Sequence, residues 1–133
     1  MVVQCIHLEP PGVMRMPAAK TNPAFMTGVP EILILRLLTD REMYGYELVQ
    51  EIESATGEAI KLGEGVVYPV LHALEESGCL RSRRKPVNGR TRVYYSVTAA
   101  GKKRLAAVTR DWDRITQAVS QVLEGASHAV TAI

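Results

Sequence analysis

The sequence predicts one small, mainly helical α+β domain that ends in a long helix, and three observations support this prediction. The length of 133 residues suits one domain and is short for two. Apolar residues recur at helical spacing in three segments, and one Asn-Gly pair separates two short segments, the second of which is rich in β-branched and aromatic residues. Hydrophobic residues make up 47% and charged residues 23%, which is typical of a globular chain and excludes collagen-like or wholly disordered classes.

The beginning of the chain lacks the pattern of a folded element. Residues 1–25 contain four prolines and no sustained hydrophobic period, so we expect a flexible leader, and Met14 and Met16 leave a later translation start open. Arg15 comes late in the first twenty residues, and these residues contain no apolar stretch of the kind found in a secretory signal. A secretory signal is therefore not predicted. No apolar run approaches the about 18 to 20 residues that cross a bilayer. We therefore expect a cytoplasmic protein with no membrane partner.

The cysteines and histidines predict no covalent or metal framework. Cys5 and Cys79 lie far apart, no CxxC pair is present, and the chain has three histidines. These numbers favour a free thiol in the leader and a buried thiol in the core over a disulfide or a zinc site. We expect no metal and no cofactor.

Two helices are predicted before the middle of the chain. Residues 29–38 are apolar on nearly every side, with Pro30 tolerated in a first turn that Thr27 or Gly28 caps. A short buried helix is the favoured interpretation, and a buried strand is the alternative. Residues 44–56 form an amphipathic helix with Gly57 as a left-handed end; its apolar positions are Leu48, Val49, Ile52 and Ala55.

A third helix is predicted over residues 64–77 and ends at Gly78. Its apolar face follows helical spacing through Val67, Val70, Leu71 and Leu74. Gly65, Tyr68 and His72 lie on the opposite face. Together with the preceding helix this segment has the outline of a helix-turn-helix.

A β-hairpin follows the third helix. Its arms are residues 79–85 and 91–97, and Asn88-Gly89 at the turn suits a type I′ geometry that needs positive φ at both positions. The second arm, TRVYYSV, is rich in β-branched and aromatic residues. Arginines and lysines occupy both arms and the tip of this ribbon.

The last predicted helix runs from Ala99 to about Glu124, with Thr98 as its cap. Its apolar residues are spaced alternately by three and four, the pattern of a coiled-coil seam, and we expect dimerisation through Leu105, Val108, Trp112, Ile115, Val119 and Val122. The alternative is that this stripe packs on its own domain. The predicted organisation is therefore a leader (1–25), a DNA-binding domain (26–98), a dimerisation helix (99–124) and a frayed tail (125–133).

Charge is divided unevenly along the chain. Residues 31–76 hold ten acids against three bases, a net charge of −7, whereas residues 77–110 hold ten bases and no acid. A run of like charge is often only a solvated face. Here the run coincides with the hairpin that follows a helix-turn-helix. Binding of DNA to such a surface releases the cations condensed on the DNA, which favours the complex.

These elements in this order predict a winged helix-turn-helix with a two-stranded β-wing and a long C-terminal dimerisation helix. The third helix would enter a major groove while the wing grips phosphates, and a two-fold dimer would meet half-sites about 34 Å apart in a pseudo-palindromic operator on double-stranded DNA. The residues expected to touch DNA are Lys61, Gly65, Tyr68, His72, Arg83, Arg84, Lys85, Arg90 and Arg92.

The motifs resemble those of the PadR-like transcriptional regulators, in the short form with a single C-terminal helix. The resemblance covers residues 27–124 and rests on YGYEL at 44–48, GVVYPVL at 65–71, LEESG at 74–78, the Tyr94-Tyr95 pair and Trp112. It implies a homodimeric regulator, usually a repressor of detoxification or efflux genes that a small aromatic or drug-like effector releases. It also implies that Tyr68 and the wing bases touch DNA and that Trp112 lines an effector site. Val66 departs from the family, which commonly has a hydroxyl residue there.

The sequence also bears on two other classes of function. A winged helix that binds an acidic protein partner instead of DNA is the alternative to the regulator. An enzyme is not expected, because the chain offers no evident nucleophile-base set or phosphate loop. The Gly63-x-Gly65 pair lacks the third glycine and the preceding strand of a dinucleotide site.

Overall fold

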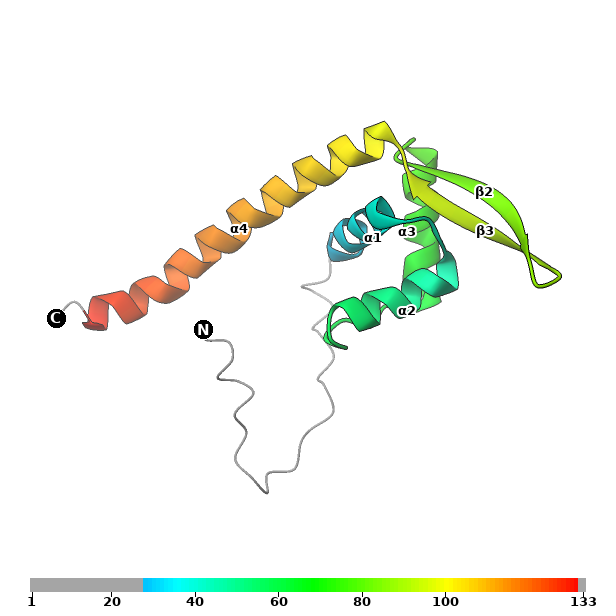
Figure 1. Ribbon diagram of the computed structural model, residues 1–133. Coiled ribbons are helices and arrows are strands. Elements are labelled where there is room, and N and C mark those ends of the chain that lie inside the picture. The colour runs from blue at the N-terminus through cyan, green and yellow to red at the C-terminus, as the bar shows by residue number, and fades with distance from the viewer. Residues whose placement is uncertain (1–27, 132–133) are drawn as a thin grey trace, which may run out of the picture.

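The computed structural model describes residues 28–131, with side chains described as far as residue 125. The elements in chain order are α1 (Val29–Asp40), β1 (Met43–Tyr44), α2 (Gly45–Ala55), α3 (Glu64–Glu76), β2 (Leu80–Val87), β3 (Arg90–Val97) and α4 (Ala99–Thr131). Three short helices and a small sheet form a compact body, the β2–β3 wing projects from one side, and α4 leaves on the other (Figure 1). The predicted mainly helical winged-helix architecture is confirmed. The predicted leader, the Thr27 cap and Cys5 lie outside the described residues.

The first segment is a helix and not the alternative buried strand. Pro30 lies in the first turn of α1, and Gly28 is the N-cap residue at φ +84°. Ile34, Leu35 and Leu38 are buried on the inner face, while Arg36 and Asp40 form an exposed ion pair. Burial of a full turn of leucine and isoleucine side chains outweighs the modest helix propensity of the β-branched residues.

One short strand was not predicted. Met43 and Tyr44 pair antiparallel with Tyr95 and Tyr94, so the sheet has three strands in the order β1-β3-β2. Tyr44 therefore belongs to a strand, and α2 begins at Gly45. Two residues are too few to show an alternating pattern in a sequence. This strand forms because its partner β3 lies beside it.

The core lies between the three helices and the inner face of the sheet. Fully buried side chains come from α1, α2 and α3, namely Ile34, Leu35, Leu48, Ile52, Val67 and Leu71. Leu80 and Tyr95 close the core from the sheet. The turns have the predicted backbone: Asn88 and Gly89 have φ of 50° and 77° at the wing tip, and Gly57 has φ of 62° after α2.

The start of α4 is fixed to the body by close contacts. The Thr98 hydroxyl accepts a hydrogen bond from the Gly101 N–H at 3.0 Å, which confirms the predicted cap, and donates one to the Gly78 carbonyl at 2.6 Å. A Cβ on Gly101 would lie 2.2 Å from the Cys79 carbonyl oxygen, so only glycine permits this approach. Leu105 then packs against the core.

Beyond Leu105, α4 extends away from the body (Figure 1). The helix continues to Thr131, past the predicted end near Glu124, so the backbone of residues 125–131 is helical where a frayed tail was expected. Gly125 lowers helix propensity by about 1 kcal/mol relative to alanine, which is too little to end a long helix. Among the described residues, no helix has both the length and the apolarity needed to cross a membrane.

Candidate nucleic-acid interface

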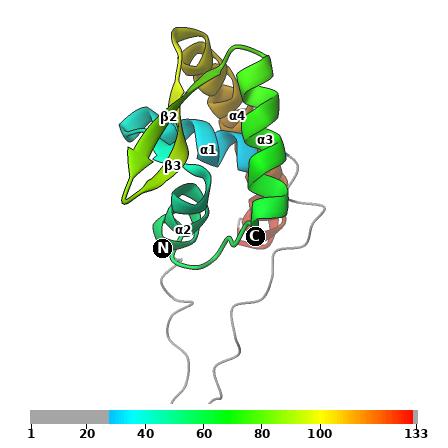
Figure 2. The same ribbon diagram turned by 90° about the vertical axis from the view of Figure 1, so that its right-hand side faces the viewer.

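Helix α3 and the wing border the same side of the body. They flank α2 on the face that Figure 2 turns toward the viewer. Ser82 on β2 donates a hydrogen bond to the Glu75 carboxylate at the end of α3, at 2.6 Å. The carboxyl end of α3 is thus joined to the base of the wing, which leaves the amino-terminal turns of α3 and the wing tip free to meet one ligand.

The predicted contact residues of α3 have different surroundings. Gly65 and His72 are exposed, whereas Tyr68 is half-buried. The Tyr68 ring lies against the backbone of Gly45 at the start of α2, where a Cβ would come within 2.3 Å of the ring. The His72 ring follows, with its centroid 6.2 Å from that of Tyr68. These three residues therefore follow one strip of α3 on the side nearer α2.

The first turn of α3 offers backbone and apolar surface. A Cβ on Gly65 would meet nothing within 4 Å, so the protein's own packing does not require glycine there. Val66 next to it is 43% exposed. Lys61, in the loop before α3, forms an ion pair with Glu53 at 3.4 Å.

The strand register divides the wing bases between two faces. Side chains alternate along each strand. The pairing of β2 with β3 places five bases on one face, which we call the outer face: Arg81, Arg83, Lys85, Arg90 and Arg92. Arg84 lies on the other face, together with Ser82 and Tyr95, and that face is turned toward α3. The sequence prediction had treated these bases as one group.

Three of the outer-face bases are held by two neighbours, Glu42 and Tyr44, which the sequence did not connect with the wing. The Glu42 carboxylate, just before β1, accepts hydrogen bonds from Arg83 Nε at 3.0 Å, Arg83 Nη2 at 2.6 Å and Lys85 Nζ at 2.9 Å. Arg92 stacks over the Tyr44 ring, with its Cζ 4.3 Å from the centroid. No local signal connects Glu42 or Tyr44 with the wing, because the β1–β3 pairing that brings them there joins segments far apart in the sequence.

Hydrogen bonding and burial shift three pKa values in this region, and the hydrogen bonds to Glu42 raise that of Arg83. Hydrogen bonds from Arg83 and Lys85 lower the pKa of Glu42 to about 2, so the carboxylate is charged at neutral pH. Burial raises the pKa of Tyr95, with smaller contributions from Glu75 and Tyr68. Three of the five bases of the outer face, Arg83, Lys85 and Arg92, are therefore held by neighbouring side chains.

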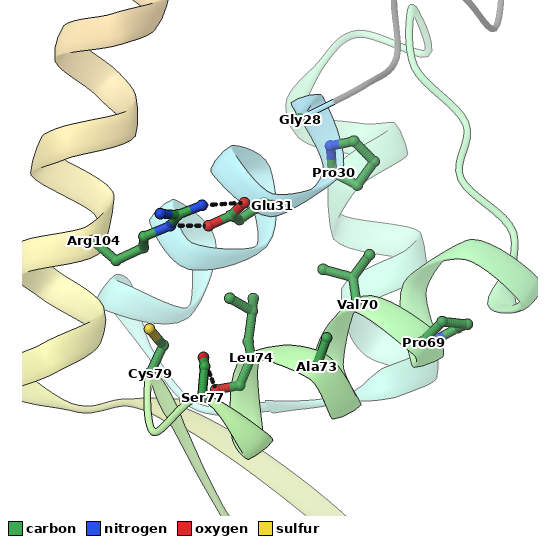
Figure 3. Close-up of a pocket in the computed structure, with 10 residues that line it drawn as sticks. All are labelled: Gly28, Pro30, Glu31, Pro69, Val70, Ala73, Leu74, Ser77, Cys79 and Arg104. Atoms are coloured by element: carbon green, nitrogen blue, oxygen red, sulfur yellow. Dashed lines mark hydrogen bonds and ion pairs between the residues drawn. The ribbon is translucent and has the colours of Figure 1, made fainter.

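A second surface feature lies on the opposite side of α3. An open groove of about 750 Å³ runs between the start of α1, the outer side of α3 and the first turns of α4 (Figure 3). Pro30, Val70 and Leu74 give it an apolar lining, and the Glu31–Arg104 ion pair borders it. Cys79 lines it as a free thiol, and Trp112 lies further along α4.

The exposed part of α4 carries the predicted apolar stripe. Trp112 is 47% exposed, and Ile115, Val119 and Val122 are more exposed still. Leu105, the first residue of the predicted seam, packs against the protein's own core instead. Leu123 adds a further exposed apolar side chain beside the stripe.

The three-helix body, the projecting β-hairpin and the joined helix α3 define a winged-helix protein of the kind found in transcriptional regulators. Residues 34–107 match the model of the "Transcriptional regulator PadR-like family", and the chain belongs to this family. A curated relative, the transcriptional regulator Rv3488 of Mycobacterium tuberculosis, is 35% identical over 104 residues, which cover 78% of this chain and 92% of the relative.

Solved structures show the same fold. A transcriptional regulator from Clostridium thermocellum has a TM-score of 0.70 at 26% identity, covering 74% of this chain and 96% of that one. A PadR family regulator from Eggerthella lenta has a TM-score of 0.67 at 28% identity, covering 77% of this chain and 88% of the other. The family resemblance drawn from the sequence motifs is thus confirmed, and the family consists of transcriptional regulators rather than enzymes.

Proposed function

We propose that this chain is a homodimeric, sequence-specific DNA-binding repressor that a small molecule releases from its operator. The observation that carries the proposal is that α3 and the wing border the same side of the body (Figure 2), with Arg84 on the wing face turned toward α3 and five further bases on its outer face. DNA presents one phosphate charge per about 1.7 Å of its axis, and a hairpin that carries several bases gains affinity for it by displacing condensed cations.

Helix α3 is proposed to enter the major groove with its first turns. Glu75 and Glu76 lie at the other end of the helix, where they stay away from phosphates. Tyr68 and His72 are placed to reach a phosphate or a base edge, and the open surroundings of Gly65 allow close backbone approach. The remaining expected phosphate contacts are Lys61 and the wing bases Arg83, Arg84, Lys85, Arg90 and Arg92.

Dimerisation is proposed to occur through α4. The stripe of Trp112, Ile115, Val119 and Val122 is exposed on a helix that extends away from its own domain, and a coiled-coil partner would cover it. Two winged helices joined in this way would address half-sites of a palindromic operator.

The effector is proposed to be a flat, mostly apolar molecule. Trp112 on the dimer stripe offers a stacking surface. The groove between α1, α3 and α4 is a second candidate, since its occupant would touch both the DNA-reading helix and the dimerisation helix. Quenching of Trp112 fluorescence by anilinonaphthalene sulfonate would support the first location, and unchanged emission would favour the groove.

The proposal is tested by mixing the purified protein with sheared genomic DNA and sequencing the fragments that it retains. We expect enrichment of a few fragments that share a palindromic sequence, and the adjacent genes would indicate the class of effector. No retardation of any duplex at 50 mM salt, combined with capture of an acidic protein, would support the alternative of a protein-interaction module.

A further inference from the structure

The bases on the outer face of the wing bind a carboxylate of the same chain, that of Glu42. The Glu42 carboxylate receives three hydrogen bonds from Arg83 and Lys85, and the Glu42 side chain is only 25% exposed. The Arg83 guanidinium binds it in a two-pronged arrangement, one bond to each oxygen. A guanidinium binds two oxygens of a DNA phosphate in this same manner. Glu42 thus occupies the position on Arg83 that a phosphate would take.

The aromatic rings of the sheet hold the bases in this arrangement. Lys85 Nζ lies 4.3 Å from the centroid of the Tyr94 ring, and Arg92 lies over Tyr44 at the same distance. The two rings meet edge to face, with centroids 5.4 Å apart. The three cations are therefore positioned before any ligand arrives, and cation-ring contacts of this kind favour retention of that position.

Glu42 also changes the charge that the wing presents. Three bases, Arg83, Lys85 and Arg92, surround one carboxylate, so the cluster carries three positive charges and one negative charge. Because hydrogen bonds from Arg83 and Lys85 hold the pKa of Glu42 near 2, the carboxylate keeps its charge throughout the physiological range. The net charge of the cluster is thus two and not three.

We propose that Glu42 is a specificity-determining residue of the wing: it competes with DNA phosphate for Arg83 and Lys85 and so weakens binding to DNA of arbitrary sequence. Binding then depends more strongly on the contacts of α3, which read the operator. This inference rests on the proposed DNA-binding function. It assigns to an acidic residue of the DNA-facing domain a role in rejecting wrong sequences.

The experiment compares Glu42→Gln with the wild type and with Asp40→Asn. Asp40 is the matched control: its loss changes the total charge equally, but it pairs with Arg36 on its own helix. Affinity for a 30-base-pair duplex of arbitrary sequence is measured between 50 and 200 mM salt. Since each neutralised phosphate adds about 0.9 to the log-log salt slope, we expect Glu42→Gln to steepen the slope by about 0.9 and Asp40→Asn to change it much less.

A coupling measurement separates the local role from a structural one. In a background of Arg83→Gln with Lys85→Gln, the further change Glu42→Gln should no longer affect the slope, because the bases that it releases are absent. The ratio of operator to arbitrary-sequence affinity should also fall in the single variant Glu42→Gln. Circular dichroism melts check that each variant folds.

The outcomes distinguish this inference from the proposed function. If the wild type binds DNA and Glu42→Gln has the slope of Asp40→Asn, Glu42 has no role in the discrimination and the inference is wrong. An effect that persists without Arg83 and Lys85 would overturn it equally. If neither the wild type nor any variant binds a duplex at 50 mM salt, the DNA-binding function itself is refuted.

Discussion

The ring of Tyr68 on α3 rests directly on the backbone of Gly45, the first residue of α2. A Cβ at Gly45 would lie 2.3 Å from Tyr68 Cζ and 2.4 Å from its hydroxyl oxygen, so no other residue fits without displacing the ring. This contact joins the two helices of the helix-turn-helix and places the Tyr68 hydroxyl beside the start of α2. It gives a physical reason for a glycine between two tyrosines at 44–46.

Two glycine substitutions should therefore have opposite effects. We expect Gly45→Ala to displace the Tyr68 ring and to lower the free energy of unfolding by about 1 kcal/mol, the low end for overpacking, because the clash is with the end of a half-buried side chain and not with backbone. Gly65→Ala should leave stability unchanged or raise it slightly, because its Cβ points into open space and alanine favours a helix. If DNA approaches that backbone, Gly65→Ala should nevertheless weaken DNA binding. Denaturant unfolding measures the stability, and mobility shifts measure DNA binding. Equal stability of Gly45→Ala and Gly65→Ala would contradict the packing argument.

The junction of α4 with the body gives a second prediction. Gly101→Ala places a methyl group 2.2 Å from the Cys79 carbonyl oxygen, a backbone atom that cannot rotate away. Alanine gains about 1 kcal/mol in helix propensity, but overpacking costs about 1 to 3 kcal/mol, so net destabilisation is expected. Ala100→Gly is a control for propensity alone, since Ala100 is exposed. A thermal melt in which Gly101→Ala is more stable than the wild type would show that α4 can shift at this junction to make room for the methyl group.

Sequence patterns were sufficient for the elements that depend on local chemistry. Apolar spacing located α2 and α3, and Asn88-Gly89 located the wing turn, because positive φ at both positions is a local requirement. The buried segment at 29–38 left helix and strand open, and only tertiary packing decides such a case.

The parts that sequence patterns missed depend on distant partners. β1 exists because β3 lies beside it, and Glu42 joins the wing because β1 brings it there. The division of the wing bases between two faces follows from the strand register, which the sequence did not specify to the residue. Leu105 fits the heptad spacing as well as Trp112 does, but only the first lies close enough to the body to join its core.

Dimerisation through α4 gives a third prediction. Trp112 is the sole tryptophan, so its emission reports directly on the stripe. If a partner helix covers it, emission should shift to longer wavelength on dilution as dimers dissociate. Val119→Glu should yield a monomer in sedimentation equilibrium without changing the melting of the domain, because Val119 is 52% exposed and distant from the core. Gln117→Glu, on the same helix, controls for added charge. A wild-type monomer at micromolar concentration would refute the α4 interface.

The Glu42 ion pairs predict a specific dependence of stability on pH. The folded-state pKa of Glu42 is about 2, against 4.5 for the free side chain. Since the folded pKa is depressed, the stabilisation is fully present above about pH 5 and is lost as the pH falls toward 2. The difference in unfolding free energy between wild type and Glu42→Gln should therefore stay constant from pH 7 to 5 and shrink below that. A difference that does not depend on pH would show that these ion pairs do not contribute.

The most direct test of the central claim is the salt dependence of DNA binding by two paired variants. Arg84→Gln with Arg90→Gln removes two exposed wing bases, and Lys102→Gln with Lys103→Gln removes the same charge from the exposed side of α4. If the wing grips phosphates, the wing variant should lose about 1.8 from the log-log salt slope and the α4 variant much less. Equal losses in the two variants, or binding by the wild type that does not depend on salt, would contradict a wing that holds DNA.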